Sequence, residues 1–289
     1  MGVARFDAGQ RGEMVRRPSC PALRTYVRGY CGYFESATAL TPRVELPSGS
    51  VGLIVGLGPA VEVAYPGHRH RLTARMTSFV AGLHDSHAVV KATGWQQGLQ
   101  IELTPVGAHM LLDVSMDSLA NRVVELDQVL GRFAAQLVER LYETASWPSR
   151  FDVLDAVITS RLAIARAPAP AITWALRRLT ETRGLVGIGA LAEELGSSRQ
   201  YLAAGFREQV GLPPKTLARI LRFQHVIRVL EHEGEARLAQ VADECGYYDQ
   251  AHLNRDFRAF AGRTPSQFLA CRLPNGAGLA SSERGKRRG

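Results

Sequence analysis

Two segments of the chain, IGALAEELGSSRQYLAAGFREQVGLPP (188–214) and LAQVADECGYYDQAHLNRDFRAFAGRTP (238–265), carry one pattern. In each, apolar residues at i, i+3, i+4 and i+7 are followed at once by a glycine, Gly196 or Gly246. This spacing predicts a short amphipathic helix that ends at the glycine. Ser198 and Asp249 follow, and both are good helix N-caps because a side-chain oxygen there accepts a free backbone N–H. The sequence therefore predicts two units of helix, turn and capped helix.

Such a unit is a helix-turn-helix, and the alanine four residues before each turn glycine, Ala192 or Ala242, lets its two helices pack closely. Helical hairpins also repeat in solenoids, but two copies are too few to stack into one. Pro213 and Pro214 open a long helix that we expect to reach about Glu233, because proline is tolerated in a first turn. This helix is expected to fix the distance between the two units.

The segments LAEELGSSRQYLAAGFREQVGLPPKTLARILRFQHVIRVLE (191–231) and LAQVADECGYYDQAHLNRDFRAFAGRTPSQF (238–268) resemble the DNA-binding domain of the AraC/XylS family of bacterial transcription regulators. The stretch CGYYDQAHLNRDFRAFAGRTPSQF (245–268) carries most of the resemblance. The resemblance implies two helix-turn-helices joined by one long helix, with each recognition helix in a DNA major groove. It also implies double-stranded DNA and RNA polymerase as partners.

The residues expected to contact DNA lie on the outward faces of the two capped helices and beside their turns. They are Ser198, Arg199, Gln200, Ala203, Ala204, Arg207, Tyr248, Gln250, Ala251, Asn254, Arg255 and Arg258. Arginine can make a bidentate contact with guanine, and Gln and Asn can do so with adenine. Arg207 and Arg258, one turn further along, are expected to meet phosphates or surface carboxylates. Ala204 departs from the family, which often has a long polar side chain there.

Residues 23–104 are rich in short apolar runs separated by Gly and Pro, which is typical of an antiparallel barrel or sandwich of cupin type. Residues 107–112, 116–123, 126–142 and 150–164 then show helical spacing, and residues 1–20 look flexible. The predicted class is α+β, a β-rich domain with trailing helices followed by an all-α domain. The predicted domains are 1–167 (sensor or dimerisation), a linker at 168–171, 172–273 (DNA-binding) and a disordered basic tail at 274–289.

Four histidines are candidate metal ligands, since cupins collect metals with histidines on neighbouring strands. His68 and His70 stand in one polar stretch, and His84 and His87 in another, without an acidic partner at a completing spacing. We therefore expect no metal, no cofactor and no catalytic residue. Glu45 and Glu102 lie in apolar strand contexts, where a solvent-facing position is favoured over an effector-facing one.

The net charge of +8 leans towards the C-terminal part of the chain, which suits an anionic partner such as DNA. We expect a cytoplasmic, nucleoid-associated bacterial regulator that does not enter a membrane. Its N-terminal domain is expected to bind a small-molecule effector, to form a homodimer, or both; residues 126–142 could mediate dimerisation or belong to the core. Two alternatives stay open: an enzymatic or metal-binding cupin with a DNA-binding appendage, and a constitutive DNA binder.

Overall fold

The computed structural model describes residues 2–7, 11–36, 42–64, 73–92, 94–233, 238–270 and 279–280 of the 289-residue chain. His68, His70 and Cys271 lie outside these ranges, as does most of the expected tail. Of the helices in the described ranges, none combines the length and the apolar character that a membrane crossing requires.

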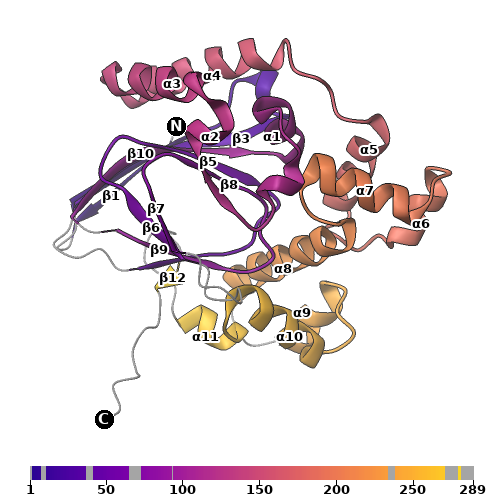
Figure 1. Ribbon diagram of the computed structural model, residues 1–289. Helices are drawn as coiled ribbons and strands as arrows, with labels where there is room; N and C mark the ends of the chain where they lie inside the picture. Colours follow the sequence, from indigo (N-terminus) through magenta and orange to yellow (C-terminus); the bar gives the residue numbers. More distant parts are fainter. Residues whose placement is uncertain are drawn as a thin grey trace.

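The N-terminal part of the described chain folds into two antiparallel sheets (Figure 1). The larger sheet has the spatial order β1 (Gly2–Asp7), β2 (Arg11–Arg17), β3 (Val27–Ser36), β10 (Trp95–Leu103), β5 (Val51–Gly56), β8 (Phe79–Ala81) and β11 (Val123–Glu125). The smaller sheet has the order β12 (Leu279–Ala280), β4 (Arg43–Glu45), β9 (Ala88–Lys91), β6 (Val61–Ala64) and β7 (Thr73–Met76). The expected β-rich domain is confirmed.

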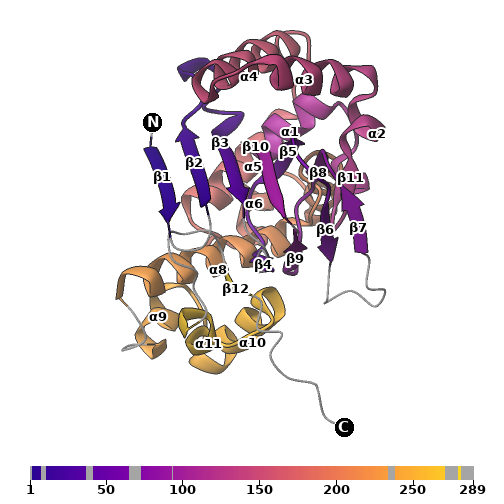
Figure 2. The same ribbon diagram turned by 90° about the vertical axis from the view of Figure 1, so that its left-hand side faces the viewer.

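The first residues of the chain form a strand hairpin, so the expectation that residues 1–20 are flexible was wrong. β1 pairs with β2 from Gly2↔Arg16 to Asp7↔Arg11, and β2 pairs with β3 (Figure 2). Met14 and Val15 are buried. The sequence of this segment shows no clear alternation of apolar and polar residues, so it does not predict a strand. The strands are formed because β2 pairs with β3. Leu279 and Ala280 belong to the tail that was expected to be disordered, and that expectation was wrong for these two residues, because they pair with β4.

Helices follow the sheets, with two departures from the predicted elements. They are α1 (Pro105–Leu112), the 3-10 helix η2 (Met116–Leu119), α2 (Leu126–Leu130), α3 (Arg132–Glu143) and α4 (Trp147–Leu162). The helix expected over 116–123 is wrong, since it stops at Leu119 and residues 123–125 pair with β8 as β11. The helix expected over 126–142 is broken at Gly131, whose φ of 55° is incompatible with a helix.

The trailing helices belong to the core of the same domain. Leu137 and Leu141 of α3 are buried within the chain. In α4 the ring of Phe151 stacks on Tyr30 of β3 at 5.8 Å between centroids, and the Tyr30 hydroxyl donates to Asp155 at 2.7 Å. The apolar stripe of α3 is thus largely occupied by intradomain packing.

The C-terminal part is helical throughout its described residues up to Ala270. Its helices are α5 (Pro170–Glu181), α6 (Ile188–Glu194), α7 (Arg199–Val210), α8 (Pro214–Glu233), α9 (Leu238–Glu244), α10 (Gln250–Ala261) and α11 (Pro265–Ala270). Figure 1 shows α8 below the sheets, with α6 and α7 to one side and α9, α10 and α11 beneath it. The expected α+β class, with an all-α C-terminal domain, is confirmed.

The two parts pack on each other along one continuous interface. A single cluster of buried apolar side chains extends from the larger sheet through α1 and η2 into α7 and α8. α7 packs on η2 and on α1, and α1 also contacts α4. The segment between α4 and α5 is tied to the helical part, since the Ala169 N–H donates to the Gln209 side chain at 2.8 Å. The predicted boundary at 168–171 stays a prediction.

Candidate nucleic-acid interface and barrel cavity

The first unit consists of α6 and α7, and its turn is built as the sequence predicts. Gly196 has a φ of 57° and an open surrounding, so its backbone conformation is what favours glycine. The Ser198 hydroxyl accepts from the Tyr201 N–H at 3.0 Å and caps α7. Leu202 and Phe206 are fully buried against the rest of the domain. The opposite face of α7 is consequently turned outward.

That outward face contains the predicted residues of the first unit. Arg199, Gln200, Ala204 and Arg207 are exposed, and Ala203 is partly buried. The Arg199 guanidinium folds back over α6, close enough that a Cβ at Gly189 would lie 2.6 Å from its Nη2. Sequence reasoning missed Tyr201, which is 52% exposed directly after Gln200. The sequence did offer a signal: Leu202 and Phe206 are the predicted inward positions of this helix, and they leave the aromatic Tyr201 on its outer face.

Gly205 has a packing role in α7. A Cβ at this position would lie 2.5 Å from Cδ1 of Ile172 in α5. Glycine in a helix interior costs about 1 kcal/mol relative to alanine. Here the missing side chain allows α5 and α7 to approach each other closely.

The second unit consists of α9 and α10. Gly246 has a φ of 72°, and the Asp249 carboxylate accepts from the His252 N–H at 2.6 Å to cap α10. Leu253 and Phe257 are buried. The predicted residues of this unit face outward: Gln250, Ala251, Arg255 and Arg258 are exposed, and Asn254 is partly buried.

The two tyrosines at the second turn have opposite environments. Tyr248 is 94% exposed, as a phosphate-contacting residue would be. Tyr247 is buried beneath the turn, where its ring meets His252 edge-on at 5.1 Å, and burial raises the pKa of its hydroxyl. Tyr247 therefore packs inward, whereas Tyr248 faces outward.

An ion pair that the sequence did not indicate fastens α10 to α8. The Arg219 guanidinium donates to both carboxylate oxygens of Asp256, at 2.7 and 3.4 Å, and Asp256 is only 5% exposed. Arg219 also stacks over the Phe260 ring at 5.0 Å. The orientation of α10 on the long helix is thereby fixed by a charged contact as well as by packing.

Besides the packing of α1 on α7, the N-terminal domain meets the helical units through η2, Gly49 and His87. η2 lies against the end of α7, where a Cβ at Gly211 would be 3.0 Å from the Met116 carbonyl oxygen. Gly49 lies against Leu221 of α8. The His87 ring lies against Gly262, which follows α10, and burial together with Arg263 lowers the pKa of His87.

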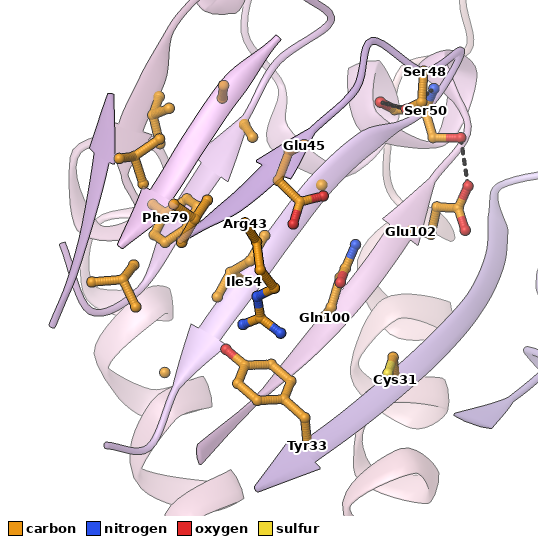
Figure 3. A pocket seen from close by; sticks show the side chains of 18 of the residues that line it. Cys31, Tyr33, Arg43, Glu45, Ser48, Ser50, Ile54, Phe79, Gln100 and Glu102 are labelled. Atoms are coloured by element: carbon orange, nitrogen blue, oxygen red, sulfur yellow. Dashed lines mark hydrogen bonds between the residues drawn. The ribbon is translucent and has the colours of Figure 1, made fainter. Parts of the chain in front are cut away.

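A cavity of about 870 Å³ opens between the two sheets. Its polar wall includes Tyr33, Arg43, Glu45 and Gln100, and Figure 3 shows these side chains directed into one space. Its apolar wall includes Ile54 and Phe79. Burial raises the pKa of Tyr33 to about 12.

Glu45 and Glu102 both line this cavity, where Glu45 is exposed and Glu102 is partly buried, so the expected solvent-facing position fits Glu45 and not Glu102. The Ser50 hydroxyl donates to Glu102 at 2.8 Å. The Glu45 side chain is exposed where it lines the cavity, and desolvation by the nearby protein raises its pKa against the opposing effect of Arg43. Strand alternation alone does not tell which of two sheet faces encloses a cavity.

The histidines near the cavity do not form a ligand set. His84 Nδ1 contacts the Gly82 carbonyl oxygen at 2.6 Å, whereas His87 is turned towards Gly262. Within the described ranges, no three His, Cys, Asp or Glu side chains gather as metal ligands would.

Two family models match the chain, one in each part. Residues 191–270 match a "Helix-turn-helix domain", and residues 15–125 match a "Domain of unknown function (DUF6597)". The chain is 26% identical over 153 residues to the HTH-type transcriptional activator RhaR of Escherichia coli, which covers 52% of this chain and 47% of RhaR. The chain thus spans about half the length of the curated relatives it matches.

Among solved structures, ToxT from Vibrio cholerae aligns over 91% of this chain and 97% of its own, with 10% identity and a TM-score of 0.44. The C-terminal domain of AraT, a response regulator from Geobacillus stearothermophilus, aligns over 42% of this chain and 94% of its own, with 20% identity and a TM-score of 0.33. The helix-turn-helix match and the two capped units show that the C-terminal part of the chain is a helix-turn-helix domain of the AraC type.

Proposed function

We propose that the chain regulates transcription by sequence-specific binding of double-stranded DNA, with α7 and α10 in successive major grooves. The observation that supports this most is the pair of outward helix faces, each capped at its start and fastened from behind by a buried leucine and phenylalanine. The 20 residues of α8 span about 30 Å as a helix. Successive major grooves on one face of DNA lie about 34 Å apart.

The chemistry of the two faces differs. In α10, Gln250, Asn254 and Arg255 present side chains suited to base edges. In α7, Arg199 and Gln200 are the long polar groups, and Ala203 or Ala204 meets a thymine methyl. The second helix is then at least an equal partner in specificity.

In vitro selection of random duplexes with the full chain tests the function. The expected product is a motif of two half-sites about 10 base pairs apart, and binding should weaken with rising salt. An unenriched library would refute the proposal.

A base-substitution series on the selected site tests the sharing of specificity. Arg255→Ala should relax one half-site by about 1–3 kcal/mol, and Arg199→Ala should relax the other. A stronger loss from Arg199→Ala than from Arg255→Ala at every position would contradict equal partnership.

We also propose that the N-terminal domain binds a small-molecule effector in the cavity between the sheets. Its volume lies within the range of ligand sites. Gly82 lines the cavity, and its Cα abuts the backbone of Leu119 in η2, which in turn packs on α7. Occupancy of the cavity therefore has a short packed route to the first recognition helix. Homodimerisation and contact with RNA polymerase stay predictions.

A thermal-shift screen of metabolites against the full chain tests effector binding, because a ligand that binds only the folded state raises its stability. Hits are then added to the DNA-binding assay. A screen without stabilising compounds would favour a constitutive DNA binder.

A further inference from the structure

Two of the charged groups beside Glu45 in the polar wall have partners within the protein. The Arg43 guanidinium donates to Glu35 at 2.9 Å, and Glu102 accepts from Ser50. The carboxylate of Glu45 makes no hydrogen bond or ion pair with the described residues. Because Glu45 is exposed where it lines the cavity, its carboxylate is available to pair with a group that arrives with the ligand.

The local charge around Glu45 is negative. The charged groups that act on it are Arg43 and Glu35, and these two form an ion pair with each other. The cluster of Glu35, Arg43 and Glu45 thus carries one excess negative charge when all three are ionised. A cation beside Glu45 would neutralise it and restore the stabilisation that the carboxylate loses through desolvation.

Gln100 supplies a second hydrogen-bond acceptor at the same place. Figure 3 shows Gln100 on β10 and Glu45 on β4 extending into the same space. The Gln100 amide, like the Glu45 carboxylate, has no hydrogen bond to a described residue. An ammonium group has three N–H donors and no acceptor, so it can use both oxygens at once.

One wall of the cavity favours an apolar body. A small hydrophobic cluster, separate from the main core, lines this wall: Val63, Phe79 and Ala88, with Ile54, Val61, Ala81, Val90 and Val123 packed against them. These side chains provide a surface without hydrogen-bonding groups. A ligand with a polar head at Glu45 would place its hydrocarbon part here.

We infer that the cavity binds a small primary amine with an apolar body, whose ammonium group lies between Glu45 and Gln100 and whose hydrocarbon part packs on Phe79 and Ile54. This inference rests on the proposed effector site and names its chemical class. An uncharged alcohol would leave the charge on Glu45 uncompensated, and a carboxylate would be repelled by it.

Calorimetry on the full chain with three probes of similar skeleton tests the inference: 2-phenylethylamine, 2-phenylethanol and 3-phenylpropanoate. The amine should bind at least roughly 10-fold more tightly than the alcohol, since a hydrogen bond to a charged group contributes more than a neutral one. The carboxylate should bind most weakly. Equal binding of amine and alcohol, or tighter binding of the carboxylate, would overturn the inference.

Glu45→Gln should remove the preference for the amine while leaving the weaker binding of the alcohol unchanged. Glu62→Gln is the matched control, because Glu62 is exposed on β6 and lies outside the cavity lining. A preference that survives in Glu45→Gln would contradict the role of Glu45. If this variant does not fold, the ranking of the three probes on the unmodified chain still tests whether the cavity prefers an amine.

DNA selection on the same preparation separates this inference from the proposed function. An amine preference in a chain that selects no DNA motif would support the ligand class and refute the DNA-binding function. If the chain selects a DNA motif but does not prefer the amine, the DNA-binding function is supported and the proposed ligand class is refuted.

Discussion

Replacing Asp256 by asparagine should weaken the attachment of α10 to the long helix α8. Asp256 is 5% exposed and accepts two hydrogen bonds from Arg219. The amide keeps the shape and one acceptor oxygen but loses the charge. The Arg219 guanidinium then sits against a neutral group while still stacked on Phe260.

The magnitude follows from the unequal burial of the two partners. Breaking a fully buried ion pair by removing one charge costs about 3–5 kcal/mol. The Arg219 side chain is 36% exposed, so water can solvate part of the remaining charge. Asparagine also retains one of the hydrogen bonds. We therefore expect a loss of about 2 kcal/mol, which is typical of hydrogen bonds to charged groups.

Chemical denaturation and thermal melting measure this loss. For a unit of about 100 residues, 2 kcal/mol corresponds to a fall in Tm of roughly 8 °C or more. The control is Glu194→Gln, which removes an exposed pair with Arg178 at 3.9 Å and should cost under about 0.5 kcal/mol. An Asp256→Asn variant that is as stable as this control would refute the assigned role of the pair.

Three further outcomes are expected. Burial raises the pKa of Glu45 in the folded state above its ordinary value of about 4.5, so the protonated carboxyl stabilises the fold below that pH and this stabilisation is lost as the pH rises through the folded-state pKa. Glu45→Gln should therefore have a higher Tm than the unmodified chain at pH 8 and the same Tm near pH 4.5. An equal difference in Tm at both pH values would contradict this. Gly205→Ala should destabilise by about 1 kcal/mol despite its better helix propensity, because its Cβ would press on Ile172, and a stabilised variant in urea titration would show that the contact relaxes freely. Gly82→Ala should cost about 2–3 kcal/mol, since its Cβ would overlap the Leu119 carbonyl, whereas Gly52→Ala, with its nearest neighbour at 3.4 Å, should be tolerated; comparable melting of the two would disprove the steric argument.

The helical half of the molecule could be predicted because its signals are local. These signals are a cap such as Ser198, a turn glycine such as Gly196 and an apolar repeat. Each acts over fewer than about ten residues and can therefore be recognised in the sequence. Local signals also explain why some predicted elements were wrong, because they do not include pairing with distant strands. The helix expected over 116–123 ends early because residues 123–125 pair with β8, a strand far away in the sequence.

Contacts between distant segments were decided by the tertiary structure. Asp256 reads as an ordinary polar residue of α10 until Arg219 of α8 is placed beside it. The N-terminal hairpin depends on β3, and the need for glycine at 205 depends on Ile172 of α5.

The sequence by itself therefore determined two capped helix pairs joined by a long helix, and with them the helix-turn-helix domain. Whether Glu45 meets solvent or a cavity was decided only when β4 of one sheet came to face β10 of the other. The physical reason is that hydrogen bonds between a side chain and the nearby backbone are set by the sequence around them, whereas burial is a property of surfaces that meet only in the folded chain.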